Sequence, residues 1–185
     1  MLLDYFAWKH SLSLNPSKGS YYFCEGNISG NDFLLVKPAT YVNNSGIAGL
    51  ELCERYNLSV EDFLVIHDDI NLETSLLKIK ISGSDGGHNG LSSLIYNFAS
   101  NKFARLRIGI GKNFKKGDMA AYVLSDFHND EIEMLKKSFE DGSLLIEEFI
   151  IGGIKNLLDT NSKINKAVKN LSNSKASSTN SLEKE

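Results

Sequence analysis

Residues 63–72, FLVIHDDINL, decide the fold class of this chain. The four apolar residues Phe63–Ile66 stand in one run, which is typical of a strand buried on both faces of a sheet. The polar residues His67, Asp68 and Asp69 follow at once. In α/β proteins, ligands bind beyond the carboxyl ends of such strands. This polar run is therefore the first candidate for a functional site.

Patterns typical of strands and of helices follow each other along the rest of the chain. The strand patterns lie at 21–25 and 33–36 (a hairpin), 76–81, 103–110 and 120–124. The helix patterns lie at 1–10, 43–56, 88–98, 129–151 (with a break near Gly142) and 161–171. This order predicts one α/β domain over residues 1–171, with a mixed, mostly parallel, twisted sheet flanked by helices. Residues 172–185 are rich in Ser, Asn and Lys, so we expect a disordered tail there.

Composition narrows the function classes. The chain has 185 residues, 42% of them hydrophobic, and a net charge of −3, so a basic patch rather than total charge would have to bind nucleic acid. Apolar runs are too short for a membrane span, and Asp4 and Lys9 interrupt the apolar start, so we predict no signal peptide. The two cysteines and four histidines lack metal-ligand spacing. We expect no metal or cofactor, and a reducing cytoplasm.

Two polar segments could carry chemistry beside Asp68. A carboxylate at the end of a strand can orient an imidazole and stabilise its charged form, although residues 67–69 could also be a simple acidic turn. Residues 86–90, GGHNG, combine flexible glycines with His88 and Asn89, which suits close approach of a ligand or a helix cap. Residues 38–46, PATYVNNSG, offer Tyr41 for stacking and Asn43 for hydrogen bonding, or again a capped turn.

Cations alternate along two of the expected strands. Lys78 and Lys80 share one face, and so do Arg105 and Arg107. If the strands are neighbours, four cations gather in one place and suit phosphate groups. The alternative is a solvated strand face that protects an edge from aggregation.

Four segments, taken in order, resemble the bacterial-type peptidyl-tRNA hydrolases: 36–46 (VKPATYVNNSG), 63–72 (FLVIHDDINL), 78–91 (KIKISGSDGGHNGL) and 103–111 (FARLRIGIG). The resemblance implies a carboxylic ester hydrolase that cleaves the bond between peptide and tRNA in peptidyl-tRNA released from ribosomes, recycling tRNA. It also implies a monomeric cytoplasmic enzyme without a metal or cofactor.

The resemblance also implies roles for single residues. Asp68 would support the general base, Asn43 and Asn89 would position the peptide and its ester end, and His88 would lie beside the site. The residues expected to contact tRNA are Tyr41, Asn43, Asn89, Lys78, Lys80, Arg105 and Arg107. A basic helix with Lys163, Lys166 and Lys169 corresponds to a region of the family that also faces tRNA.

The chain departs from the family at its beginning. The family starts with a strand, a G-x-x-N-P-G loop and an R-H-N segment with the general-base histidine, and no residue here matches that histidine. We expect that translation of the natural protein starts upstream of Met1. A non-catalytic RNA-binding module on the same fold is the alternative function, and a nucleoside- or phosphate-binding enzyme of another α/β family is a third.

Overall fold

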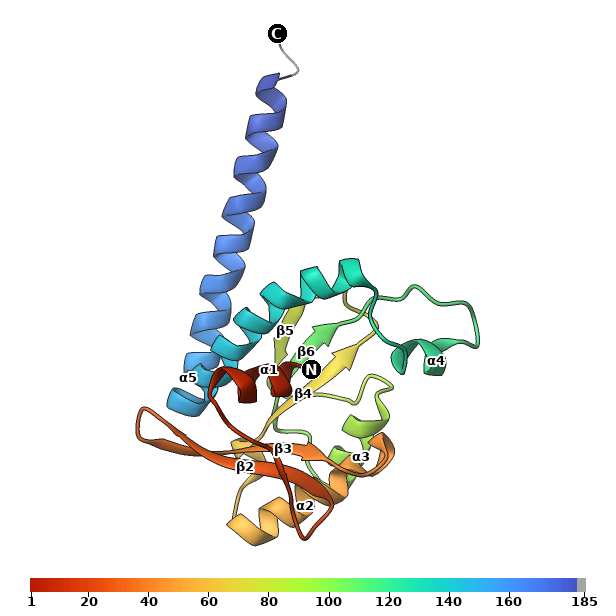
Figure 1. Cartoon of the computed structure of the whole chain (residues 1–185), viewed down its shortest axis with the longest axis vertical. Coiled ribbons are helices and arrows are strands. Elements are labelled where there is room, and N and C mark those ends of the chain that lie inside the picture. The colour runs from red at the N-terminus through yellow and green to blue at the C-terminus, as the bar shows by residue number, and fades with distance from the viewer. Residues whose placement is uncertain (183–185) are drawn as a thin grey trace.

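The computed structural model describes the backbone of residues 1–182 and the side chains of residues 1–129 and 131–170. A compact α/β body carries a long helix that projects from it (Figure 1). The strands are β1 (Asn15–Pro16), β2 (Tyr21–Ile28), β3 (Asn31–Pro38), β4 (Leu64–Asp69), β5 (Leu77–Lys80) and β6 (Ala104–Gly109). The helices are α1 (Leu2–Lys9), α2 (Ser45–Tyr56), α3 (Asn89–Phe98), α4 (Met119–Val123) and α5 (Asn129–Leu182), with 3-10 turns η1 (Val42–Asn44) and η2 (Val60–Asp62).

The strands form two sheets of three strands each. One sheet has the order β1-β2-β3 and is antiparallel, and the other has the order β4-β6-β5. In the second sheet β4 runs parallel to β6, whereas β5 is antiparallel to it. The mixed α/β class is confirmed, but among the described strands only the β4–β6 pair is parallel. Short turns join β1, β2 and β3 as antiparallel neighbours, and β5 runs antiparallel to β6 although α3 lies between them in the chain.

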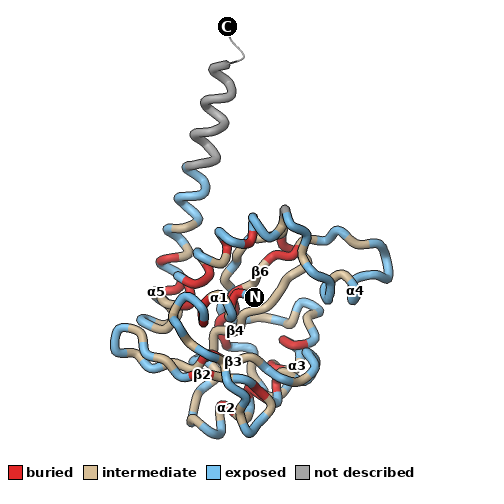
Figure 2. Tube along the Cα trace, in the orientation of Figure 1, coloured by how far each residue is buried: buried red, intermediate tan, exposed pale blue. Residues whose placement is uncertain are grey.

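Apolar helix faces cover both sides of these sheets. On one side Leu2, Phe6 and Ala7 of α1 pack with Leu145 and Leu157 of α5. On the other side, Ala48 and Leu52 of α2 pack beneath β2 and β3, while α3 packs its Leu91 and Leu94 against Phe103. Figure 2 shows the buried residues between these layers. This arrangement leaves the carboxyl ends of β4 and β6 open at one rim of the body.

Strand β4 is less buried than its sequence predicts. All six residues from Leu64 to Asp69 are only half-buried, although the apolar run led us to expect burial on both faces. The helices do cover both faces, but β4 is an edge strand with β6 on one side alone. The exposure therefore comes from the free edge of the strand.

Two expectations for the second half of the chain were wrong. Residues 120–124 were expected as a strand, but 120–123 lie in helix α4, and Tyr122 in it donates its hydroxyl to the carbonyl of Ile110. The long helix is not interrupted at Gly142, which packs against Leu2 with no space for a larger side chain. Its break lies at Gly152 and Gly153, where φ is −144° and +60°. A positive φ suits glycine because it has no Cβ.

Helix α5 continues through Leu182, so the structure differs from the disordered tail expected for 172–185. The tail contains no glycine or proline, and nothing in it stops a helix that is already under way. The low apolar content of this segment shows that it cannot form a packed core, but it does not show that the segment cannot be helical. Residues 183–185 lie outside the described part of the chain.

No helix within residues 1–182 is both long enough and apolar enough to cross a membrane.

Candidate active site

Asp68 and His88 meet at the end of β4. The Nε2 atom of His88 lies 3.3 Å from Oδ1 of Asp68, and the carboxylate keeps about 38% of its side chain exposed. Burial acts to raise the pKa of Asp68, but the hydrogen bond from His88 and the electrostatic influence of His88 and His67 outweigh it and lower the pKa. Asp68 is therefore an ionised, partly exposed hydrogen-bond acceptor at neutral pH.

The protonation of His88 follows from its neighbours. Its Nδ1 atom accepts hydrogen bonds from the backbone N–H groups of Gly90 and Leu91, at 3.1 and 3.2 Å, and so caps the first turn of α3. Because Nδ1 is an acceptor, the proton of the neutral ring is on Nε2, which donates to Asp68. His88 is therefore a helix cap, as one interpretation of residues 86–90 predicted, and it is also the hydrogen-bond partner of Asp68. Neither of its nitrogens is left to deprotonate water.

His67 is the second imidazole of the site. Its Nδ1 lies 2.6 Å from the carbonyl oxygen of Asp68 and must donate to it, which leaves Nε2 as an acceptor. Nε2 is buried and has no partner among the described residues. Burial lowers the pKa of His67 to about 4, so the ring is neutral at pH 7. The ring centroids of His67 and His88 are 4.9 Å apart, and the rings meet edge to face.

This pKa predicts a pH-dependent stability. Between pH 6.5 and about 4, the unfolded histidine binds a proton that the folded one does not, so the free energy of unfolding is complete above pH 6.5 and falls as the pH drops toward 4. We expect this histidine to account for a loss of about 2 to 3 kcal/mol. Urea unfolding at several pH values measures this dependence. The free energy of unfolding should fall less steeply with decreasing pH in His67→Asn than in the unchanged chain. The exposed His128→Asn is the matched control, and an unchanged slope in His67→Asn would contradict the prediction.

The two asparagine segments lie side by side next to this pair. Helix α3 contacts η1, and the N–H of Gly46 donates to the hydroxyl of Ser93, at 3.0 Å. Asn43 and Asn89 are both exposed. Tyr41 is 84% exposed, which leaves its ring open for stacking. Asn43 and Asn89 thus lie on adjacent segments, and both are open to solvent.

The neighbouring strands bring the predicted cations into register. Lys78 pairs with Arg107 across the sheet, and Lys80 pairs with Arg105, so the expected gathering of the four residues on adjacent strands is confirmed. The lysines are exposed. Arg107 forms an ion pair with Asp69, at 2.6 Å between Nη2 and Oδ2. Burial acts to raise the pKa of the Asp69 carboxyl, but its hydrogen bonds outweigh burial and lower the pKa.

Arg105 differs from the other three cations. Its side chain is 1% exposed, stacks over the ring of Phe103 and donates to the carbonyl oxygens of Ser84 and Gly83, at 2.7 and 2.6 Å. The expectation of a phosphate contact by Arg105 does not fit this burial, because its donors already hold the loop that leads to His88. The alternating pattern correctly placed Arg105 on the same strand face as Arg107. It could not show that the loop with Gly83 and Ser84 covers Arg105.

A basic loop after β6 was missed. Lys112, Lys115 and Lys116 are exposed, and Lys112 donates to the side chain of Asn71 just after β4. The signal was available as three lysines within five residues. The loop adds positive charge near the rim where β4 and β6 end.

The other histidines are remote from this chemistry. His10 is bonded to Glu147, at 3.0 Å, and His128 precedes α5. No group of three or more metal-ligating side chains occurs in the described part of the chain. In the described part of the chain, the features at this rim are the Asp68–His88 hydrogen bond and the cations of β5 and β6.

Comparisons relate the chain to proteins of known function. The family model described as peptidyl-tRNA hydrolase matches residues 1–171. A peptidyl-tRNA hydrolase of Alkaliphilus metalliredigens is 37% identical over 153 residues, which are 83% of this chain and 82% of that protein. One of Finegoldia magna is 41% identical over 143 residues, 77% of this chain and 75% of that protein.

A solved structure gives the same result. The crystal structure of peptidyl-tRNA hydrolase from Acinetobacter baumannii superimposes with a TM-score of 0.80 and 26% sequence identity. The superposition covers 86% of this chain and 81% of that one.

Proposed function

Because the chain belongs to the peptidyl-tRNA hydrolase family, we propose that it hydrolyses the ester bond between peptide and tRNA in peptidyl-tRNA released from ribosomes. The observation that carries the proposal is the ionised Asp68, held by His88 at the open end of β4. The test is release of N-acetyl-aminoacyl groups from tRNA, measured against tRNA that carries no ester.

In this reaction water attacks the ester carbonyl carbon, and a new C–O bond forms while the bond to the tRNA ribose oxygen breaks. The proton from water is taken up by a base, and the tRNA oxygen leaves with a proton. The lowered pKa of Asp68 makes it a weak base. Its proposed role is to orient and stabilise the general base, a role that the doubly hydrogen-bonded His88 and the buried His67 do not fill. In this proposal the amide groups of Asn43 and Asn89 hold the peptide and the ester end of the substrate.

Cations on neighbouring strands support a tRNA-binding surface. Lys78 and Lys80 are exposed on β5 and lie beside Arg107 of β6, which is half-buried and ion-paired with Asp69. Tyr41 offers a ring for stacking with a base at the tRNA end. Lys163, Lys166 and Lys169 are exposed on the projecting part of α5 (Figure 1). Arg105 is left out of this surface because its guanidinium is buried.

Replacing Lys78 or Lys80 with alanine is expected to weaken tRNA binding without a comparable loss of turnover at saturation. Each removed phosphate contact should make the dependence of log Kd on log salt concentration shallower by about 0.7 to 0.9. Filter binding across a salt series measures this slope. Lys18→Ala, an exposed lysine on the β1–β2 side of the molecule, is the control, and an equal change in it would refute a local tRNA surface.

One observation favours a non-catalytic RNA-binding module as the second candidate. Both nitrogens of His88 are engaged, and His67 is neutral and buried. Neither is therefore a ready general base. Binding of tRNA with unchanged affinity, but no ester cleavage by this chain at high enzyme concentration, would select that candidate.

We also propose that the protein acts as a cytoplasmic monomer. Cys24 and Cys53 are unpaired thiols, which fits a reducing compartment. Light scattering should give a mass near 20.5 kDa.

A further inference from the structure

The turn that precedes His88 is closed by Asp85. Oδ1 of Asp85 accepts a hydrogen bond from the backbone N–H of Gly87, at 2.7 Å, and its carbonyl oxygen accepts one from the N–H of His88, at 3.1 Å. Gly86 and Gly87 have φ of +62° and +84°, and positive φ at both central positions characterises a type I′ turn. Asp85 therefore closes this turn twice, through its main chain and through its carboxylate.

The outer side of the turn has no other support. A Cβ atom added to Gly86 or to Gly87 would meet no other atom within 4 Å, and both residues are exposed. Glycine has more conformational freedom than any other residue. Among the described residues, Asp85 is the one whose side chain hydrogen-bonds to the backbone of 85–88. The conformation of the two glycines therefore depends on this side chain.

Both ends of the loop are fixed more firmly than its middle. At the beginning, the buried guanidinium of Arg105 donates to the carbonyl oxygens of Gly83 and Ser84. At the end, His88 leads directly into α3, which packs its Leu91 in the core. Residues 85–87 connect these two anchors. A change of their conformation moves the backbone of His88 and leaves the first anchor in place.

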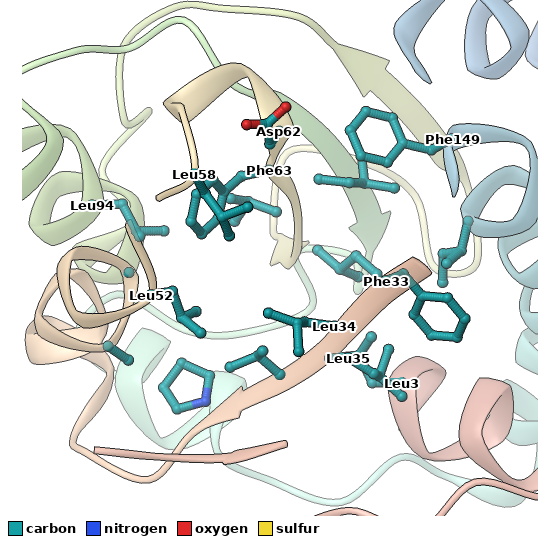
Figure 3. Close-up of a pocket in the computed structure, with 18 of the residues that line it drawn as sticks. Leu3, Phe33, Leu34, Leu35, Leu52, Leu58, Asp62, Phe63, Leu94 and Phe149 are labelled. Carbon is teal, nitrogen blue, oxygen red and sulfur yellow. The ribbon is translucent and has the colours of Figure 1, made fainter. Parts of the chain in front are cut away.

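The other side of His88 offers few polar contacts. Together with Asp68, His88 lines part of a cavity of about 1260 Å³ between the two sheets. The side chains labelled in Figure 3 are apolar except for Asp62, whose carboxylate is hydrogen-bonded to Ser59. This part of the cavity wall provides packing but no hydrogen bond to the imidazole. The direction of the ring is therefore set by the loop, by α3 and by Asp68.

The contacts of His88 tolerate only a small displacement. Its Nε2 lies 3.3 Å from Oδ1 of Asp68, and at about 3.6 Å such a pair is no longer hydrogen-bonded. Its Nδ1 lies 3.1 and 3.2 Å from the backbone nitrogens of Gly90 and Leu91. A shift of the ring by about 1 Å breaks at least one of these contacts, and misplacements of this size are large in catalysis.

The charge of Asp85 does not itself favour tRNA binding. Burial lowers the pKa of Arg105, and the negative charge of Asp85 acts to raise it. The side chain of Lys80 passes over Gly83, where an added Cβ would lie 2.7 Å from Nζ. A carboxylate among these cations repels tRNA phosphates. What Asp85 contributes to the site is therefore the closed turn and not affinity for RNA.

From these contacts we infer that Asp85 is a positioning residue, which holds His88 in the place from which it hydrogen-bonds to Asp68. Asp85 acts through the turn and touches neither peptide nor tRNA in this role. The inference rests on the proposed function only for its effect on ester cleavage. The position of His88 can be measured without turnover.

The test compares Asp85→Ala, which has no acceptor for the N–H of Gly87, with Asp85→Asn, whose amide oxygen keeps one. The backbone amides of Gly90 and Leu91 report on His88, because they donate to its Nδ1 and do not contact Asp85. We expect them to exchange hydrogen about five- to tenfold faster in Asp85→Ala. In Asp85→Asn they should exchange as in the unchanged chain.

The tautomer of His88 gives a second measurement. Long-range nitrogen–proton NMR correlations should show a single form, protonated on Nε2, in the unchanged chain and in Asp85→Asn. In Asp85→Ala the two tautomers should be mixed, because the ring leaves Asp68. Ser17→Ala is the matched control, since the hydroxyl of Ser17 accepts the N–H of Gly19, at 2.9 Å, in another exposed turn. It should change neither measurement.

Ester release separates this inference from the proposed function. Asp85→Ala should lower kcat about tenfold, whereas Asp85→Asn should keep kcat and bind tRNA slightly more tightly. Faster exchange at Gly90 and Leu91 without a loss of kcat would support the positioning of His88 and count against its part in the chemistry. Unchanged exchange and an unchanged tautomer in Asp85→Ala would overturn the inference. Equally faster exchange in 94–98 would also overturn it, since α3 as a whole would then be destabilised.

Discussion

Asp68→Asn is expected to lower kcat/KM for N-acetyl-aminoacyl-tRNA by about 100-fold or more. The substitution keeps the shape of the side chain but removes the negative charge that accepts the Nε2–H of His88, at 3.3 Å. An amide at this position cannot stabilise a positive charge on a neighbouring base in the transition state. Single-turnover ester release under saturating enzyme isolates this loss from binding.

The control for Asp68 is Glu73→Gln, which removes an exposed carboxylate a few residues beyond β4. It should leave turnover within a factor of two or so, because it lies outside the hydrogen-bonded site. Affinity for tRNA should be unchanged in Asp68→Asn, or slightly higher, since a negative charge near phosphates is lost. Turnover at the normal rate in Asp68→Asn would show that this carboxylate has no part in the chemistry.

Arg105→Met should lower the free energy of unfolding by about 3 kcal/mol or more, because two buried charged hydrogen bonds are lost and two carbonyl oxygens lose their donor. The guanidinium holds Gly83 and Ser84, at 2.6 and 2.7 Å, and so fixes the loop that leads to His88. Urea unfolding followed by circular dichroism measures the loss. It is large relative to the total stability of about 5–15 kcal/mol for a typical domain.

Arg55→Met is the matched control. Arg55 is exposed, and its guanidinium lies over the ring of the neighbouring Tyr56. It should change stability by about 0.5 kcal/mol or less. Arg105→Lys should also destabilise, because an ammonium group cannot reproduce the planar fork that reaches both carbonyls. If Arg105→Met kept full stability but bound tRNA weakly, Arg105 would be a phosphate contact after all.

The difference between Arg105 and Arg107 shows where sequence reasoning ends. Period-two alternation placed both on one face of a strand, and the pairing with Lys78 and Lys80 bears this out. Alternation cannot tell how far a loop from elsewhere covers that face, and the loop at 83–84 covers Arg105 alone. The role of a cation therefore depended on a contact between residues about twenty positions apart.

The sequence marks Asp68 and His88 by local patterns, although it does not show that they are hydrogen-bonded to each other. Asp68 follows an apolar strand, and His88 lies in a glycine-rich turn before a helix. Such patterns can be recognised in a sequence because they depend only on neighbouring residues in the chain. The two-sheet arrangement was not predictable in this way. Which strand edges remain free depends on long-range pairing, and that information is not contained in the period of any one segment. The break at Gly152 and Gly153 was misplaced to Gly142 for a related reason, since a helical glycine can serve close packing as well as a turn.

The break at Gly152 and Gly153 sets the direction in which the second half of α5 projects. The helix rises about 1.5 Å per residue, so Lys163 stands roughly 15 Å and Lys169 roughly 24 Å from Gly153. A rotation of about 20° at the fulcrum would sweep Lys169 through roughly 8 Å, about one Debye length at physiological salt. The reach of the outermost charges is thus set by the backbone torsions of two residues that carry no charge themselves. The projecting part of α5 can be shortened, lengthened or redirected without changing the rim where β4 and β6 end.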